Sequence, residues 1–140
     1  GWNTIENEGL LKEVIDVFKE AGIRTSIFIE TDLELIDGAK TVGADRIELY
    51  TEEYALKYGT HPSDAIEPYK IAAKHAKGIG LGVNAGHDLN LENLSFFAEQ
   101  LFGNLDEVSI GHALIADALY LGLHNSIQQY LYCLNPISWK

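Results

Sequence analysis

Apolar residues recur with two different spacings along this chain. Near its start, Leu11, Ile15 and Phe18 fall three to four positions apart, and Gly22 follows them. This spacing puts them on one face of a helix that a glycine then ends, so we expect a helix over residues 8–21. The next segment, 23–29, is rich in β-branched and aromatic residues and predicts a strand.

The same alternation of helical and strand spacing continues along the chain. Thr31-Asp-Leu-Glu34 has the form of a capping box, which opens a helix. After the second strand we expect a polar loop through His61, and Pro68 is tolerated because it lies near the first turn of the helix that follows. The predicted helices are 31–43, 64–77, 91–101 and 113–134, and the other predicted strands are 46–50, 81–83 and 108–110.

One helix followed by four strand–helix units is typical of an α/β protein with parallel strands. A complete (βα)8 TIM barrel needs about 250 residues, whereas this chain has 140. We therefore expect residues 1–140 to form a single segment of about four βα units, half of a TIM barrel, within one larger barrel domain. The chain contains no Met, so we expect Gly1 either to follow a removed initiator or to be internal to a longer product.

Composition restricts the partners and the compartment. The chain has 10 basic and 21 acidic residues, and its net charge of −11 disfavours nucleic acids and anionic membranes as partners. No apolar run approaches the ~20 residues that span a bilayer, and the polar start is not a signal peptide. Cys133 is the only cysteine, which excludes an intrachain disulfide and favours a packed thiol. We expect a soluble, cytoplasmic protein.

Two predicted strands lead into the dipeptide Gly-His, at Gly86-His87 and at Gly111-His112. In a βα barrel the active site lies where the strands end, and loop N–H groups near a helix N-terminus commonly bind phosphate there. His87 is also a candidate for proton transfer, because imidazole titrates near neutral pH. The alternative is that both glycines only make tight turns and both histidines are structural.

Glu48 and Asn84 are further polar residues near predicted strand ends. Glu48 lies between two apolar residues, so strand alternation predicts that it faces the barrel interior. A carboxylate in that position is costly unless it is paired. We therefore expect it either to have a functional role or to form an ion pair with Arg46 or Arg24.

The remaining histidine signals are weaker. His75 and His124 lie in predicted helices, where solvent-facing or packing roles are expected, and His61 lies in a loop that is a candidate lid. Glu48 and the histidines of the two Gly-His dipeptides are candidate ligands for a divalent metal. No close-spaced ligand motif supports that alternative, so neither a metal nor a cofactor is predicted.

Four segments together resemble a known family. They are Arg24-Thr-Ser-Ile-Phe-Ile29, Asp45-Arg-Ile-Glu-Leu-Tyr-Thr51, Gly82-Val-Asn-Ala-Gly-His87 and Val108-Ser-Ile-Gly-His-Ala113. In this order they resemble the C-terminal part of pyridoxine 5′-phosphate synthase, over essentially the whole chain. The resemblance implies a TIM-barrel transferase of vitamin B6 biosynthesis. It also implies two phosphorylated substrates, 1-deoxy-D-xylulose 5-phosphate and 3-amino-2-oxopropyl phosphate, and a homo-oligomer, namely an octamer.

The resemblance further implies roles for individual residues. His87 would be the proton donor, Glu48 a carboxylate that stabilises charged intermediates, and the backbone of Gly111 and His112 a cradle for the aminoketone phosphate. Asp88 stands where many members carry glycine, so its N–H is a candidate for binding phosphate while its carboxylate must turn away or repel the ligand. Tyr50 occupies a position where histidine is frequent.

Several parts of the family's site have no counterpart in these 140 residues: the Asn-x-Asp-His segment, the Arg- and His-rich loop and the principal glutamate base. The chain is therefore expected to supply the C-terminal part of an active site. Two other hypotheses remain open. One is a non-catalytic, phosphate-binding half-barrel scaffold that pairs its open sheet edges with another copy. The other is a different phosphosugar enzyme of the barrel class, such as an epimerase.

Overall fold

The computed structural model describes residues 1–135, in which four parallel strands alternate with helices. The strand order is β1-β2-β3-β4, so each strand pairs with the next one along the chain. The strands are β1 (Ser26–Ile29), β2 (Arg46–Tyr50), β3 (Gly82–His87) and β4 (Glu107–Ile110). The helices are α1 (Glu8–Glu20), α2 (Leu33–Thr41), α3 (Glu52–Tyr58), α4 (Pro62–Gly78), α5 (Leu94–Gln100), α6 (His112–Leu121) and α7 (Leu123–Cys133). The predicted α/β class with parallel strands is confirmed, and the arrangement is that of a partial TIM barrel.

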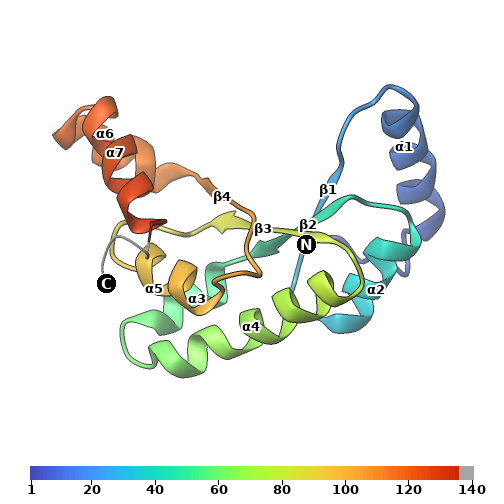
Figure 1. Ribbon diagram of the computed structural model, residues 1–140, viewed down its shortest axis with the longest axis horizontal. Helices are drawn as coiled ribbons and strands as arrows, with labels where there is room; N and C mark the ends of the chain where they lie inside the picture. The colour runs from blue at the N-terminus through green and yellow to red at the C-terminus, as the bar shows by residue number, and fades with distance from the viewer. Residues whose placement is uncertain (136–140) are drawn as a thin grey trace.

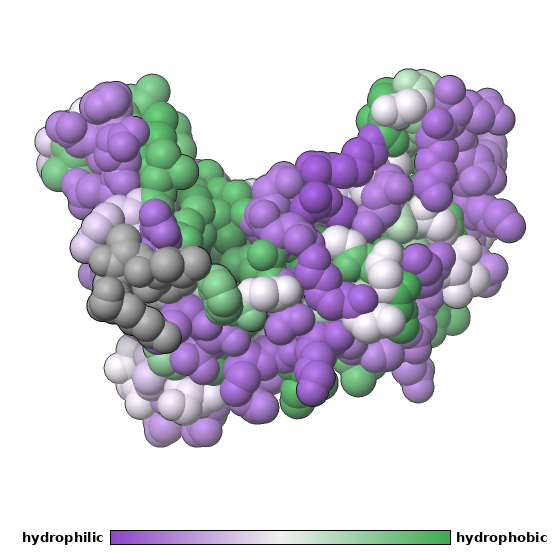
Figure 2. Space-filling view, viewed as in Figure 1, coloured by the Kyte–Doolittle hydropathy of each residue, from purple (hydrophilic) through white to green (hydrophobic). Residues whose placement is uncertain are grey.

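Strand alternation separates a buried face of the sheet from an open one. Ile47 and Leu49 of β2 and Val83 and Ala85 of β3 are fully buried, and they share one core with residues of the helices. In Figure 1, α2 to α5 lie along one side of the sheet, whereas α1 and the pair α6–α7 rise at its two ends. The polar side chains of β2 alternate with the core residues and therefore lie on the opposite face. Figure 2 shows a hollow between the two raised arms.

Both arms expose apolar side chains. Leu119 and Tyr120 of α6 are 82% and 89% exposed, and Val17 of α1 is 61% exposed. The groove beside α1 has a volume of about 310 Å³ and is lined in part by Trp2 and Phe18. Burying apolar area is favourable, so these arms are suited to further packing against protein.

Residues 52–58 form α3, where the sequence predicted a polar loop, and that prediction was wrong. Glu52 and Glu53 lie in the first turn and suit the positive end of the helix dipole. Tyr54 is fully buried, and its ring packs at centroid distances of 5.0 Å from Phe97 and 5.9 Å from Tyr69. Tertiary packing of one aromatic residue therefore fixes a short helix in a segment that is polar in sequence.

Other element boundaries also differ from expectation. The predicted helix 113–134 is two helices, because Gly122 has a φ of +79° and turns the chain between them. Helix α4 begins at Pro62, so Pro68 lies in its second turn and not near its first. Strand β3 runs on to His87, beyond the predicted end at Val83. Helix α2 begins after Asp32, whose carboxylate accepts hydrogen bonds from two backbone N–H groups of the first turn.

The described part of the chain, residues 1–135, has no helix that is both long enough and apolar enough to cross a membrane. The thiol of Cys133 is buried and unbonded, as the sequence predicted.

Candidate functional site

Four rings gather at the carboxyl ends of the strands. His87, at the end of β3, lies 5.4 Å from the ring of Tyr50, 6.5 Å from that of Phe28 and 6.5 Å from that of His112, measured between centroids. The side chain of His87 is 53% exposed, so it meets both the aromatic wall and the solvent. The structure thus brings together the two histidines that the Gly-His dipeptides singled out, although they are 25 positions apart in sequence (87 and 112).

Tyr50 extends this wall and is held by its own hydrogen bond. Its hydroxyl donates to Oε2 of Glu52 at 2.8 Å. That hydrogen bond, together with partial desolvation and the negative charge of Glu52, raises the pKa of Tyr50 to about 12. The phenol therefore stays protonated at neutral pH and acts as a neutral surface beside His87.

The backbone of His87 is strained. Its φ is +97°, and it is the only residue other than glycine with a positive φ among residues 1–135. A side-chain-bearing residue in this region costs of order 1–3 kcal/mol, and such strain concentrates at functional sites. The preceding Gly86 is packed so closely that a Cβ there would lie 2.6 Å from the carbonyl oxygen of Ser109. The pair Gly86-His87 thus combines a position that requires glycine with one that tolerates histidine at a cost.

Asp88 orients the ring of His87. Oδ2 of Asp88 lies 2.9 Å from Nδ1 of His87. A carboxylate only accepts hydrogen bonds, so this contact keeps the proton on Nδ1 and leaves Nε2 to exchange a proton with a ligand. The backbone N–H of Asp88 donates to the hydroxyl of Thr51 at 3.1 Å, so it is already engaged. Substrate binding by Asp88 stays a prediction, and a phosphate there would have to share that N–H.

Gly111 and His112 form the start of α6, directly beside His87. A Cβ on Gly111 would lie 3.5 Å from the carbonyl oxygen of His87. Gly111 is the N-cap of α6 and His112 its first residue, and both are exposed. The N–H groups at a helix N-terminus attract anions. The site therefore combines an imidazole with a helix N-terminus, and phosphate binding by Gly111 and His112 stays a prediction.

Glu48 lies on the open face of the sheet and near the same glycine. Its side chain is half-buried, and its Oε1 would be 3.0 Å from a Cβ on Gly86. The predicted ion pair with Arg46 or Arg24 was wrong, because both arginines pair with Glu107 instead. Within residues 1–135 no ion pair of Glu48 occurs, which leaves its carboxylate available on the face that also carries the histidines.

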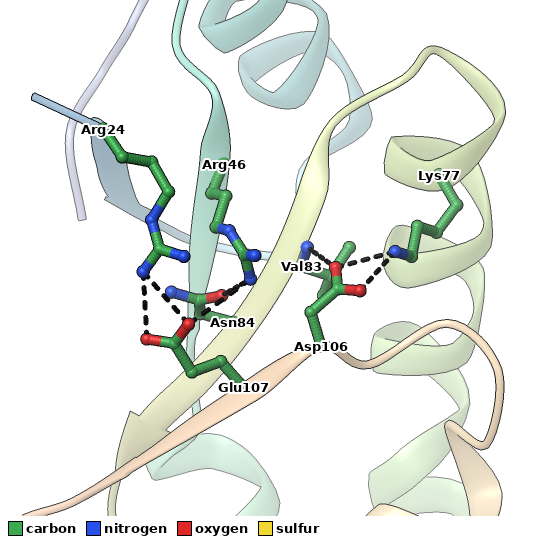
Figure 3. A network of polar contacts seen from close by, with 7 residues as sticks. All are labelled: Arg24, Arg46, Lys77, Val83, Asn84, Asp106 and Glu107. Atoms are coloured by element: carbon green, nitrogen blue, oxygen red, sulfur yellow. Dashed lines mark hydrogen bonds and ion pairs between the residues drawn. The ribbon is translucent and has the colours of Figure 1, made fainter. Parts of the chain in front are cut away.

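A second polar cluster occupies the amino ends of the strands and does not belong to this site (Figure 3). Glu107 accepts hydrogen bonds from Arg24 at 3.0 and 3.3 Å, and its Oε2 lies 3.5 Å from Arg46. Arg46 also donates to the side-chain oxygen of Asn84 at 2.9 Å. The prediction that placed Asn84 at the working end of its strand was therefore wrong, because its amide is bonded inside this network.

Asp106 joins helix α4 to strand β3 at the same amino ends of the strands. Its carboxylate accepts from Nζ of Lys77 at 2.6 and 2.7 Å and from the backbone N–H of Val83 at 2.7 Å. Burial acts to raise the pKa of Asp106, but the hydrogen bonds from Lys77 and Val83 outweigh it and hold the pKa below its ordinary value. The group is therefore a charged structural anchor.

The other histidines lie outside the cluster. His75 pairs with Asp37 at 2.6 Å on the surface, and His124 is exposed on α7. His61 is the N-cap residue of α4, and its Nδ1 lies 2.9 Å from the hydroxyl of Thr60. A lid role for His61 stays a prediction.

No group of three or more His, Cys, Asp or Glu side chains is placed to hold a metal ion in residues 1–135. Glu48 and the two clustered histidines accordingly do not form a ligand set. The arrangement suits acid–base chemistry on a phosphorylated ligand, in which imidazole supplies the proton and backbone N–H groups meet the phosphate.

Parallel strands in sequential order, with reactive side chains where they end, define the class of βα-barrel proteins. The family described as "Pyridoxal phosphate biosynthesis protein PdxJ" matches residues 1–136. The chain belongs to this family.

Similar proteins carry a consistent name. The chain is 56% identical over 131 residues to a protein of Flavobacterium johnsoniae and 58% identical over 130 residues to one of Porphyromonas gingivalis, each named pyridoxine 5′-phosphate synthase. A protein of Bacteroides fragilis with the same name is 55% identical over 134 residues. These matches cover 93–96% of this chain but 54–56% of each relative. The chain thus spans about half the length of the curated relatives it matches.

Proposed function

We propose that this chain supplies one half of the active site of a pyridoxine 5′-phosphate synthase. The reaction condenses 1-deoxy-D-xylulose 5-phosphate with 3-amino-2-oxopropyl phosphate, closes the pyridine ring and releases inorganic phosphate and water. The observation that carries the proposal is His87, an exposed imidazole held in a strained backbone conformation beside the N-terminus of α6. The name shared by the relatives at 55–58% identity supports the same reaction.

In this proposal each candidate residue has a separate task. His87 donates a proton from Nε2 to a leaving oxygen, because Asp88 occupies Nδ1. The N–H groups of Gly111 and His112 hold the phosphate of the aminoketone, since they begin a helix beside His87. Glu48 stabilises positive charge that develops on the substrate nitrogen, because its carboxylate lies on the same open face.

The proposal also requires a complementary half. The sheet has β1 and β4 at its two edges, and strand edges favour pairing. A partner that closes the barrel would cover these edges and the apolar arms of α1 and α6 together. The same surfaces favour the second candidate, a non-catalytic half-barrel that assembles with another copy of itself.

One assay separates these functions. The two substrates are incubated with the 140-residue chain alone and with an intact protein that carries the chain together with a complementary half, and pyridoxine 5′-phosphate and released phosphate are quantified. We expect both products from the intact protein and at most traces from the chain alone. An intact protein that binds phosphate but forms no product would contradict the synthase and favour the scaffold. Turnover of other phosphosugars without ring closure would instead indicate a different barrel enzyme.

A further inference from the structure

Thr51 is a fully buried polar residue that has no role in the reaction proposed above. It stands between β2 and α3 and is the N-cap residue of α3, but its side chain makes no cap hydrogen bond. Threonine at this position usually accepts a hydrogen bond from the first turn of its own helix. Here the hydroxyl is directed to a different strand, so a local stabilising contact has been given up.

The hydroxyl of Thr51 bonds to the backbone on both sides of His87. It donates to the carbonyl oxygen of Gly86 at 2.7 Å and accepts from the N–H of Asp88 at 3.1 Å. These partners lie 35 and 37 positions away in the sequence. One side chain therefore fixes the peptide groups before and after the only strained non-glycine residue among residues 1–135.

A second buried side chain, that of Asn93, bonds to the backbone of the same segment on the C-terminal side of His87. Nδ2 of Asn93 donates to the carbonyl oxygen of Asp88 at 3.2 Å, and Asn93 is 2% exposed. A strained φ persists only where the surroundings impose it, and Thr51 and Asn93 supply that constraint here. Thr51 constrains His87 more directly than Asn93 does, because Thr51 bonds to the peptide groups on both sides of His87, whereas Asn93 bonds only to the carbonyl of Asp88.

We propose that Thr51 is a positioning residue that holds the His87 imidazole in its productive orientation through the backbone of Gly86 and Asp88. The expected effect of Thr51 on turnover rests on the proposed function. The expected effect of Thr51 on the backbone of His87 rests on the geometry alone. Because Thr51 is fully buried, we expect it to make no contact with the substrate. Its loss should therefore lower turnover more than substrate binding, because a misplacement of about 1 Å at a reacting group can cost about 100-fold in rate.

The test compares two threonines in the intact protein that carries this chain. Thr51→Val removes the hydroxyl with little change in volume, and Thr51→Ser retains it. Thr4→Val is the matched control, because Thr4 is also fully buried and donates a 2.6 Å hydrogen bond to a backbone carbonyl, that of Leu35. We expect kcat to fall about 10- to 100-fold in Thr51→Val with KM changed less than about threefold. Thr51→Ser and Thr4→Val should retain kcat within about threefold.

A second measurement reads the geometry without using activity. In NMR spectra, a positive φ gives His87 a strong nuclear Overhauser effect between its own amide and α protons. This signal should persist in Thr4→Val and Thr51→Ser and weaken in Thr51→Val. If Thr51→Val fails to fold, Thr51→Cys, which keeps a weak donor and acceptor, should give an intermediate loss of kcat.

The outcomes separate the two proposals. An active wild-type protein with equal kcat values in Thr51→Val and Thr4→Val would overturn the positioning role and leave the synthase intact. A lowered kcat with an unchanged His87 signal would also overturn it, since the effect would not pass through this backbone. An inactive wild-type protein would refute the proposed function, and the NMR signal alone would then decide the role of Thr51.

Discussion

The two ends of the same four strands are built differently. At the amino ends, Arg24, Arg46 and Glu107 are joined by ion pairs, and Lys77 pairs with Asp106. At the carboxyl ends, the rings of His87, Tyr50, Phe28 and His112 adjoin one another, and His87 is half exposed and strained. The charged groups at the amino ends form ion pairs with each other. At the carboxyl ends, His87 is oriented by Asp88 and remains exposed to solvent.

This difference favours a structural role for the amino ends and supports the reactive role proposed for the carboxyl ends. Paired charges have little capacity left for a ligand, and partly exposed pairs such as Arg24–Glu107 stabilise the folded state by at most about 1 kcal/mol each. A strained residue raises the energy of the folded state, so it is tolerated where it serves binding or chemistry. Substitutions at the amino ends should therefore change stability, and those at the carboxyl ends should change activity first.

His87→Ala in the intact protein should have the largest effect. We expect kcat to fall by about 10²- to 10⁴-fold, the usual contribution of a general acid, while the affinity for inorganic phosphate changes less than about threefold. Steady-state kinetics and a phosphate titration measure the two quantities. His75→Ala is the matched control, because His75 is bonded to Asp37 on the surface, and it should retain activity. Unchanged turnover in His87→Ala would remove this residue from catalysis.

Gly86→Ala should disrupt the carboxyl ends by steric overlap. The added Cβ would meet the Ser109 carbonyl oxygen at 2.6 Å and Oε1 of Glu48 at 3.0 Å. Overpacking of this kind costs about 1–3 kcal/mol in the free energy of unfolding, which denaturant titration measures. Gly59→Ala is the control, because a Cβ at Gly59 would have no atom within 4 Å apart from those of its own chain neighbours, and its φ is −64°. Equal stability of the two variants would show that β3 and β4 can separate without cost.

His87→Gly tests the strain directly. Glycine adopts positive φ without the clash of a Cβ, whereas alanine retains that clash. Both variants lack the imidazole, so the comparison reports the relief of strain less the greater backbone entropy of unfolded glycine. We expect His87→Gly to be more stable than His87→Ala by about 1 kcal/mol in denaturant titrations. A glycine variant that is less stable than the alanine variant by about 1 kcal/mol, the entropic cost of glycine alone, would mean that the φ of +97° is not a source of strain.

Asp106→Asn tests the amino ends through pH. The hydrogen bonds from Lys77 and Val83 depress the pKa of Asp106 in the folded protein, so the unfolded state binds more protons as acid is added. Stability from this carboxylate is therefore complete above its ordinary pKa of 3.8 and is lost as pH falls through the lower folded value. Unfolding measured from pH 6 to pH 2 should show a smaller acid dependence in the variant and unchanged activity at pH 7.

Asp45 is an internal check on that experiment. The N–H of Thr25 lowers the pKa of Asp45 in the same direction, so Asp106→Asn should retain part of the acid dependence. Adding Asp45→Asn should flatten the profile further. An acid profile identical to that of the wild type in both variants would contradict the assignment of these carboxylates as structural anchors.

Local patterns predicted most of the fold. Apolar residues repeat about every two residues in the four strands and about every 3.6 residues in the helices between them, and both spacings can be seen among neighbouring residues. Helix α3 was missed because its stabilising residue, Tyr54, gains its energy from Phe97 and Tyr69, which are distant in sequence. The break between α6 and α7 could have been predicted, because Gly122 is a glycine inside an apolar helical pattern.

The candidate site divides in the same way. The two Gly-His dipeptides were visible as strand ends, and parallel strands necessarily bring their carboxyl ends together. The sequence did not indicate the arginine partners of Glu107, and an ion pair with Arg46 or Arg24 was one of two expectations for Glu48, beside a functional role. The choice of ion-pair partner depends on which strand positions face each other, and Asn84 pairs in register with both Glu48 and Glu107.

The sequence by itself determined the parallel βα order, the family and the place of the two Gly-His dipeptides where strands end, because each depends on local spacing or on short motifs. Only the tertiary structure decided that His87 is strained, that Asp88 faces its ring and that Thr51 bonds across to the segment around it. The bonds of Thr51 join segments more than 30 residues apart, for which neighbouring residues carry no signal. Asp88 follows His87 directly in the sequence, but its approach to the ring depends on the backbone conformation of that segment.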